Sequence, residues 1–407
     1  MSQAPREVYA DHAATTRPAP EVVAAMTPYL GERFGNASSV HRRGEAAREA
    51  LEEARARVAA LIGAAPEEIV FTASGSEANN LALQGSLLHA AQTPATPRGE
   101  ARRRLVVSAI EHLSVLETAR QLGARGFAVT VVPVEPNGVV DAARVAKALG
   151  PDVALVSVML VNNEIGTVQP VAEIARLAHA AGARVHCDAV QAVGKLPVDV
   201  AALGVDLLTL AGHKFHGPPG AAALFVRRRT RLVPLTLGGH QERSRRAGTE
   251  NLAAVVGLGV AAERAGGSLA AETPRRVAAL GGRLLDGLLS RVSGAALNGD
   301  RERRLPSIVN LRFDGLDGEA VLHELDLEGV TVSTGSACSA ASPGPSHVLI
   351  ALGLRPEDAH ASVRFSLGEE NDEADVDRII AATPGVVTRL RALGGPAQAG
   401  RVARASA

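Results

Sequence analysis

Short apolar runs alternate with helical stretches between residues 66 and 230. Several of these runs are apolar at consecutive positions, which is typical of strands that are buried on both faces of a sheet. The alternation predicts βα units and a mostly parallel, seven-stranded sheet flanked by helices. The expected strands are Ile69–Thr72, Leu105–Ser108, Ala128–Val132, Ala154–Met159, Arg184–Cys187, Leu207–Leu210 and Ala221–Val226.

Helical spacing precedes this block, and a different pattern follows it. A helix carrying Leu51, Ala54, Val58 and Leu61 on one face should stop near Gly63. After about residue 262, we expect Gly266 and Gly267 to interrupt the chain. A new helix should then bear Val277, Leu280, Leu284 and Leu288 on one face and lead to shorter strands such as Ile308–Phe313.

These patterns together predict an α/β protein of two domains. The large α/β domain is expected over residues 17–262. The smaller α+β domain is expected to combine residues 1–16 with residues 263–393. The tail over residues 394–407 is rich in Gly, Ala and Arg, and we expect it to be disordered.

Composition narrows the class of protein. The 43 basic and 43 acidic residues give a formal net charge of zero, so nothing attracts nucleic acid or anionic lipid over long range. The two cysteines suit a reducing compartment. The longest apolar run, Leu252–Ala262, is too short to span a bilayer, and no basic-then-apolar leader opens the sequence. We therefore expect a soluble cytoplasmic protein that binds neither nucleic acid nor membrane.

Two segments could bind phosphate. The run Ser74-Gly75-Ser76-Glu77 lies between a strand and a helix, where backbone N–H groups can hold an anion. Any turn from a strand to a helix favours Ser and Gly, so plain helix capping is the preferred interpretation of this segment taken alone. In the loop over residues 92–104, Arg102–Arg104 could also bind phosphate, but a solvated surface loop is the preferred interpretation.

Lysine is rare in this sequence. The 43 basic residues include three lysines, Lys147, Lys195 and Lys214. Lys214 follows a strand in a turn bounded by Gly and Pro, where open α/β sheets bind ligands. Because arginine cannot supply a free amine, a lysine kept here indicates Schiff-base chemistry. A chance surface lysine is the alternative. Lys147 is expected on a surface helix and Lys195 is expected to be exposed.

Asp188 ends another buried strand, and Gln191 follows it by three residues. A buried carboxylate needs a cation or a protonated heterocycle as its partner, and a pyridinium nitrogen is such a partner. Capping of the next helix is the alternative role for Asp188.

One of the two cysteines lies among small residues. The segment over residues 333–345 surrounds Cys338 with Ser, Ala, Gly and Pro, which predicts a mobile loop carrying a nucleophilic thiol. Cys187, in contrast, is expected in the core of a strand.

The chain resembles the cysteine desulfurases of the class V aminotransferase family, and in particular the NifS/IscS-like group that serves iron–sulfur assembly and tRNA thiolation. Each matching motif is short, but their order and spacing are specific. They are Asp11–Thr16, Glu111–His112, Asn162–Gly166, Asp188–Gln191, Gly212–Lys214, Arg246–Thr249, Gly335–Cys338 and Arg364–Gly368.

The resemblance implies a fold-type I enzyme that uses pyridoxal 5′-phosphate to convert L-cysteine to L-alanine. It implies that Lys214 forms the Schiff base and moves the substrate α-proton, and that Cys338 takes the sulfur as a persulfide. His112 would stack on the pyridine ring of the cofactor. Asp188 would bind the ring nitrogen, and Gln191 would reach the phenolic oxygen. The cofactor phosphate would be held by Gly75, Ser76 and His213, with Thr249 contributing from the neighbouring subunit of a homodimer. Asn163 and Arg364 would bind the substrate carboxylate.

The resemblance also implies sulfur-acceptor proteins, such as an iron–sulfur scaffold or a tRNA-thiolation enzyme, and no metal. Ala211 stands where many relatives have serine, which removes one phosphate hydroxyl. His12, Ser39 and His41 fall in motif-like positions without an assigned role. The alternatives are a selenocysteine lyase, another class V aminotransferase or lyase, and a non-catalytic sulfur-trafficking protein.

Overall fold

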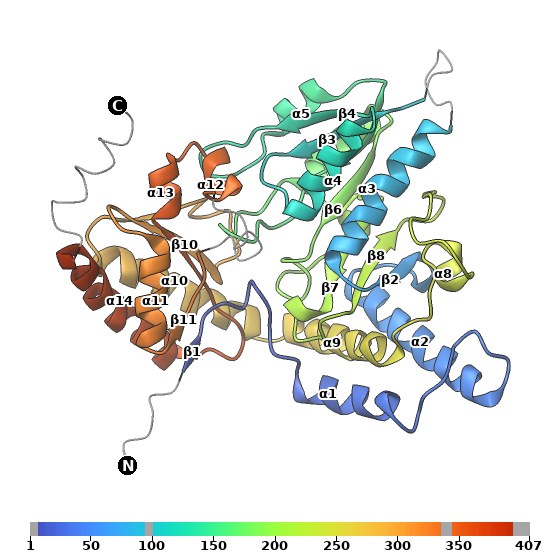
Figure 1. The fold of residues 1–407 in the computed structure, drawn as a ribbon, viewed down its shortest axis with the longest axis horizontal. Helices are drawn as coiled ribbons and strands as arrows, with labels where there is room; N and C mark the ends of the chain where they lie inside the picture. The colour runs from blue at the N-terminus through green and yellow to red at the C-terminus, as the bar shows by residue number, and fades with distance from the viewer. Residues whose placement is uncertain (1–6, 94–100, 335–343, 394–407) are drawn as a thin grey trace.

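The computed structural model describes residues 7–93, 101–334 and 344–393 (Figure 1). Its main sheet has the strand order β2-β8-β7-β6-β5-β3-β4, and β8 alone runs against its neighbours. This confirms the predicted α/β fold with a mostly parallel seven-stranded sheet. The strands are β2 (Ile69–Thr72), β3 (Arg104–Ser108), β4 (Ala128–Val132), β5 (Val153–Ser157), β6 (Arg184–Asp188), β7 (Leu207–Ala211) and β8 (Ala222–Val226).

Helices cover both faces of this sheet, as the continuous apolar strands predicted. One face packs against α3 (Gly75–Ala91) and α4 (Leu113–Ala124). The other packs against α2 (Arg42–Leu61), α6 (Val171–Ala180) and α9 (Leu252–Ala270). In β8, for example, Leu224 belongs to the first apolar cluster and Phe225 to the second.

The helix α9 corrects one expectation. It continues through Gly266 and Gly267 to Ala270, so these glycines do not interrupt it, and residue 262 lies inside the helix. A β-carbon at Gly259 would lie 2.6 Å from the Cα of Ala54, which shows how closely α9 approaches α2. Close tertiary packing therefore outweighs the poor helix propensity of its glycines.

Within the described ranges, α9 is also the one helix long and apolar enough to cross a membrane by length and composition. Its buried residues belong to the core cluster that it shares with α2 and the sheet. The contacts of α9 are therefore those of a core helix.

A second core lies to the left of the main sheet in Figure 1. Its sheet has the order β12-β10-β9, and a separate parallel pair joins the N-terminal strand β1 to β11. The predicted helix over Val277–Leu288 is confirmed as part of α10. The elements of this unit are β1 (Val8–Tyr9), α10 (Thr273–Arg291), β9 (Ala295–Leu297), β10 (Ile308–Phe313), α11 (Gly318–Leu327), β11 (Val330–Thr331), β12 (Ser362–Ser366) and α14 (Glu373–Leu393).

The remaining short elements connect these layers. They are α1 (Pro20–Met26), η1 (Thr27–Leu30), η2 (Pro66–Glu68), α5 (Ala142–Ala148), α7 (Val200–Leu203), η3 (Gly212–Lys214), α8 (Gln241–Ser244), α12 (His347–Ala351) and α13 (Pro356–His360). The predicted domain limits remain a prediction, and the expected tail over residues 394–407 lies outside the described residues.

Candidate active site

A cavity of about 310 Å³ opens at the carboxyl ends of the main-sheet strands. Open α/β sheets bind ligands at this edge. Its lining includes nine of the residues singled out from the sequence: Gly75, Ser76, His112, Asn163, Asp188, Gln191, His213, Lys214 and Arg364. The structure thus brings together residues that are separated by up to 289 positions in the chain, since 364 minus 75 is 289.

The N-terminus of α3 forms one wall of the cavity. Ser74 caps this helix, and its side chain accepts a hydrogen bond from Glu77 N at 3.1 Å. A β-carbon at Gly75 would lie 3.1 Å from Val190 Cγ2 and 3.6 Å from Ala211 Cβ, so the turn is built for a residue without a side chain. Capping is therefore confirmed, and anion binding by this turn remains a prediction.

Asp188 ends β6, and its carboxylate is held firmly at the cavity wall. Its Oδ2 accepts a hydrogen bond from Asn79 Nδ2 at 2.8 Å, and its Oδ1 accepts one from Val190 N at 3.0 Å. The sequence reasoning missed Asn79. A buried amide on the apolar face of α3, between Ala78 and Leu81, was the available signal.

Lys214 lies in η3, directly after β7. Its Nζ donates to the carbonyl oxygens of Ala13 at 2.7 Å and Ala14 at 2.6 Å, so the N-terminal segment lies against the lysine. The neighbouring His213 has its pKa lowered to about 4 by burial, with smaller effects from the positive charges of Lys214 and Lys195. His213 is therefore neutral at pH 7.

Lys195 was expected to be exposed, and this expectation is wrong. Its Nζ donates to Gln191 Oε1 at 2.7 Å, one helical turn back along the chain. Burial, with smaller effects from the charges of Lys214 and Arg364, lowers the pKa of Lys195 to about 7. Lys147 is exposed on α5, as predicted.

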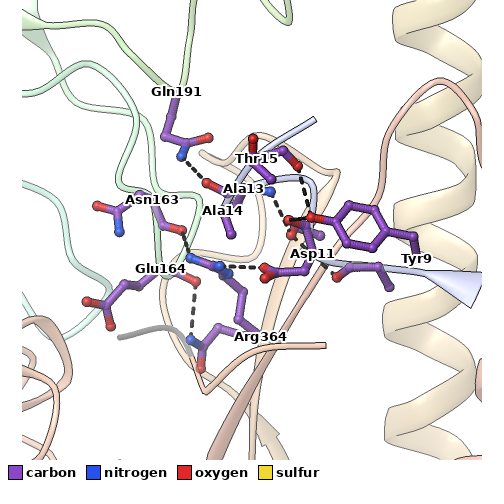
Figure 2. A network of polar contacts seen from close by, with 12 residues as sticks. Tyr9, Asp11, Ala13, Ala14, Thr15, Asn163, Glu164, Gln191 and Arg364 are labelled. Carbon is purple, nitrogen blue, oxygen red and sulfur yellow. Dashed lines mark hydrogen bonds and ion pairs between the residues drawn. The ribbon is translucent and has the colours of Figure 1, made fainter. Parts of the chain in front are cut away.

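Arg364 reaches the cavity from β12 of the smaller unit (Figure 2). One of its nitrogens donates to Asp11 Oδ1 at 2.6 Å, and the other donates to the carbonyl oxygen of Asn163 at 2.9 Å. A guanidinium at a cavity wall suits a carboxylate ligand, because its planar fork matches two oxygens. Asp11 was part of a motif, but no role was predicted for it.

His112 and Glu111 follow β3. The backbone N of Ser114 donates to His112 Nδ1 at 3.1 Å, which fixes the histidine as the N-cap of α4. Glu111 is completely buried, and burial raises its pKa to about 8, while hydrogen bonds from Ser108 and Met159 N act in the opposite direction. Glu111 is therefore largely protonated at neutral pH.

Cys338 lies outside the described residues, but both chain segments that lead to it reach the cavity. Ser333 exchanges backbone hydrogen bonds with Arg364 on one side. On the other side, His347 lines the cavity, and Ser346 donates to Glu164 Oε2 at 2.5 Å. Cys187 is buried in β6, as predicted, and burial raises the pKa of its thiol.

Other candidates lie away from this cavity. Thr249 is exposed and is not among the described residues that line it. His41 caps α2 by accepting from Gly44 N, and His12 is buried against Tyr9. Ser39 lies on the segment that leads into α2.

Arg102, which precedes β3, and Arg104, its first residue, have structural partners. Arg102 donates to the carbonyl oxygens of Val153 and Ala181, and Arg104 pairs with Asp152. Neither is among the described residues that line the cavity, so these contacts favour the interpretation without phosphate binding.

Comparison with known proteins agrees with this geometry. The family model described as "Aminotransferase class-V" matches residues 8–379. A cysteine desulfurase of Gluconacetobacter diazotrophicus is 46% identical over 386 residues, which cover 94% of each chain.

Two solved structures are similar throughout. One, described as "NIFS-LIKE PROTEIN", has a TM-score of 0.86 and 34% identity, covering 95% of this chain and all of that one. Another, described as "SspA in complex with cysteine", has a TM-score of 0.77 and 35% identity, covering 88% of this chain and 98% of that one. Full-length matches of this kind confirm the predicted resemblance, and the chain belongs to the cysteine desulfurases of the class V aminotransferase family.

Proposed function

We propose that the protein takes sulfur from L-cysteine, releases L-alanine and receives the sulfur as a persulfide on Cys338. The observation that carries this proposal is the convergence of Lys214, Asp188 and Arg364 on one cavity. The cysteine desulfurase of Gluconacetobacter diazotrophicus and the structure of SspA in complex with cysteine support the same reaction. A selenocysteine lyase or an aminotransferase on the same fold is less well supported, because simple transamination needs no thiol.

Pyridoxal 5′-phosphate is the cofactor that this cavity fits. The α3 N-terminus at Gly75 and Ser76 suits its phosphate, the Asp188 carboxylate suits its pyridinium nitrogen, and the Lys214 amine suits its aldehyde. When bound, this cofactor supplies an electron sink for the carbon next to the amino group of the substrate. Ala211 provides no hydroxyl at the phosphate end, so backbone groups and Ser76 carry more of that contact.

The residues around the cavity divide the remaining work. Asp188, held by Asn79 and the N–H of Val190, keeps a fixed negative charge at the cavity wall. His112 offers a ring face and Gln191 an amide donor. Arg364, together with Asn163, orients the carboxylate of the substrate, and Lys214 moves its α-proton.

The thiolate of Cys338 then attacks the substrate sulfur. A sulfur–sulfur bond forms, the carbon–sulfur bond breaks, and the carbon takes a proton, so that cysteine becomes alanine. The anchoring of Ser333 and His347 beside the cavity supports this role, because both lead directly to the segment that carries Cys338.

A pair of cysteine variants tests the sulfur step. Cys338→Ala should keep the absorbance of the bound cofactor and still bind cysteine, but it should release almost no sulfide or alanine. The matched control is Cys187→Ala, which removes the buried strand thiol and should retain turnover. Wild-type turnover in Cys338→Ala would contradict the proposed nucleophile.

Borohydride reduction tests the attachment of the cofactor. The reduced label should map to Lys214, and the buried amine of Lys195 is the informative internal control. A label on Lys195 would overturn the assignment of Lys214.

We further propose a cytoplasmic homodimer that passes its persulfide sulfur to acceptor proteins for iron–sulfur clusters or tRNA thiolation. A nucleophilic thiol favours a reducing compartment. The exposed position of Thr249 supports a role at the phosphate of the partner subunit. Sedimentation should then show a dimer whose dissociation on dilution is suppressed by pyridoxal phosphate.

A further inference from the structure

Lys195 lies between two cavities of the protein. Its amine contacts Gln191, which lines the active-site cavity. Lys195 itself lines a second cavity of about 160 Å³, together with His12, His216, Arg264 and Glu369. Lys214 lines both cavities.

The contact decides which way the amide of Gln191 faces. A lysine ammonium has three donors and no acceptor, so the atom that it contacts must be the amide oxygen. The nitrogen must then lie on the other side, where it donates to the carbonyl oxygen of Ala13 at 2.8 Å. Ala13 O accepts from Lys214 Nζ as well. One of the two amide hydrogens of Gln191 is thus used, and the other remains for a ligand in the cavity.

Ala13 O and Lys195 select the same orientation of this amide from its two ends, because the carbonyl accepts from the nitrogen and the ammonium donates to the oxygen. Without Lys195, Ala13 O alone would orient the amide, and Ala13 O also accepts from Lys214. An amide whose oxygen faced the cavity would repel a phenolic oxygen instead of donating to it. The positive charges of Lys214 and Arg364 lower the pKa of Lys195. The charge of Lys195 in turn lowers the pKa of His12 and of His213.

We propose that Lys195 is a positioning residue of the active site, which holds Gln191 with its nitrogen toward the cofactor and so makes it an obligate donor. This inference rests on the proposed function, because the group that receives the hydrogen bond is the phenolic oxygen of pyridoxal phosphate. The role is distinct from that of Lys214, since Lys195 acts through Gln191.

A double-mutant cycle on the full-length protein tests this role. The variants are Lys195→Met, Gln191→Leu and their combination, and the matched control is Lys147→Met on the exposed face of α5. Pyridoxal phosphate affinity and the wavelength of its absorption band are measured at pH 6. At that pH the lysine is mostly protonated, because its pKa is about 7, so its amine can only donate to the amide.

We expect Lys195→Met to weaken cofactor binding roughly 10-fold and to shift the band, as for the loss of one hydrogen bond to a charged group. In the Gln191→Leu background the same substitution should add less than about 2-fold, because the amide that it orients is gone. Lys195→Arg, which keeps the donor, should restore most of the affinity. Lys147→Met should match the parent protein.

Equal effects of Lys195→Met with and without Gln191 would overturn the inference, and so would no effect at all. Thermal unfolding of the cofactor-free variants separates a folding defect from lost positioning. If Lys195→Met unfolds, Lys195→Gln in both backgrounds completes the cycle, because a neutral amide can meet either end of Gln191 and so lacks the obligate donor. An effect of Lys195→Gln that is the same with and without Gln191 overturns the inference. If the parent protein shows no cofactor band, the proposed function has failed and this inference falls with it, whereas failure of the cycle alone leaves the proposed function intact.

Discussion

Two buried arginines, each paired with a carboxylate, differ in how deeply that carboxylate is buried and in whether the arginine lines the active-site cavity. Arg55 of α2 makes two bonds to Glu242, at 2.7 Å and 2.9 Å, and a third to Ile69 O. Its side chain is 3% exposed and that of Glu242 is 1% exposed. Arg364 contacts one oxygen of Asp11, which is 15% exposed, and it lines the active-site cavity.

The difference separates an arginine that holds the fold from one that is placed to meet a ligand. Glu242 has a left-handed backbone, with φ of 46°, and Arg243 and Ser244 follow in the same region. For each residue that is not glycine, such a conformation costs on the order of 1–3 kcal/mol, so it persists only where the surrounding contacts stabilise it. The bidentate bond to Arg55 and the N–H of Phe71, which donates to Glu242 Oε2, supply those contacts. Arg364 holds no such turn.

Breaking the first pair should have the largest effect. Glu242→Ala removes the fully buried carboxylate partner of Arg55 and leaves it, among the described residues, only the carboxylate of Glu52, whose side chain is 47% exposed. This loss should lower the free energy of unfolding by up to about 3–5 kcal/mol. Denaturant unfolding measures this change. The matched control is Glu263→Ala, which removes the exposed partner of Arg57 and should cost less than about 1 kcal/mol. An equal loss of unfolding free energy in the two variants would show that burial does not strengthen the Arg55–Glu242 pair.

Changing the second arginine should affect turnover more than stability. Arg364→Lys keeps the charge but loses the fork, so kcat/KM for cysteine should fall by about 10- to 100-fold, or about 1.4–2.8 kcal/mol. Arg55→Lys is the matched control, which should lower stability while it keeps kcat/KM within about threefold. The comparison fails if the two variants lose turnover equally. Sulfide and alanine assays with unfolding curves distinguish the outcomes.

Glu111 extends the comparison to a buried carboxyl group whose described partners are Ser108 and Met159 N rather than a cation. Its pKa is raised from 4.5 to about 8, so the folded state binds a proton that the unfolded state releases. Its contribution to stability is complete below pH 4.5 and is lost as pH rises toward 8, by up to about 1.4 kcal/mol per pH unit. Glu111→Gln should flatten this part of the stability profile between pH 5 and 8. An unchanged slope would show that Glu111 is ionised in the folded state.

Asp11 should give the smallest effect. Asp11→Asn replaces the carboxylate that competes with a substrate for Arg364 by a neutral amide whose oxygen still accepts the hydrogen bond, so KM for cysteine should fall about two- to threefold with kcat unchanged. Steady-state kinetics measures this shift. A higher KM would show instead that Asp11 is needed to hold Arg364 in place.

Local sequence pattern correctly predicted several elements of the fold. The strands β2 and β4 and the strand β10 have the predicted limits, because consecutive apolar residues bounded by turns are a local signal. The same reasoning placed Lys214, Asp188 and Gly75 at strand ends, and parallel strands bring their carboxyl ends to one edge. The small-residue segment predicted a nucleophilic thiol at Cys338, whereas its persulfide role and the role of Thr249 came from family resemblance, and all three remain predictions.

Long-range packing determines which side chains from distant parts of the sequence contact one another. The glycines of α9 looked like a break, but they are tolerated in a helix that packs closely on α2. Lys195 looked exposed because a short Gly-Lys-Leu-Pro segment carries no sign of the chain that covers it. Asn79 reaches Asp188 across 109 positions, and Arg364 reaches Asp11 across 353. Burial and hydrogen-bond partners depend on residues that are far apart in the sequence, so local periodicity cannot predict them. They determine both the charge of Lys195 and the orientation of Gln191.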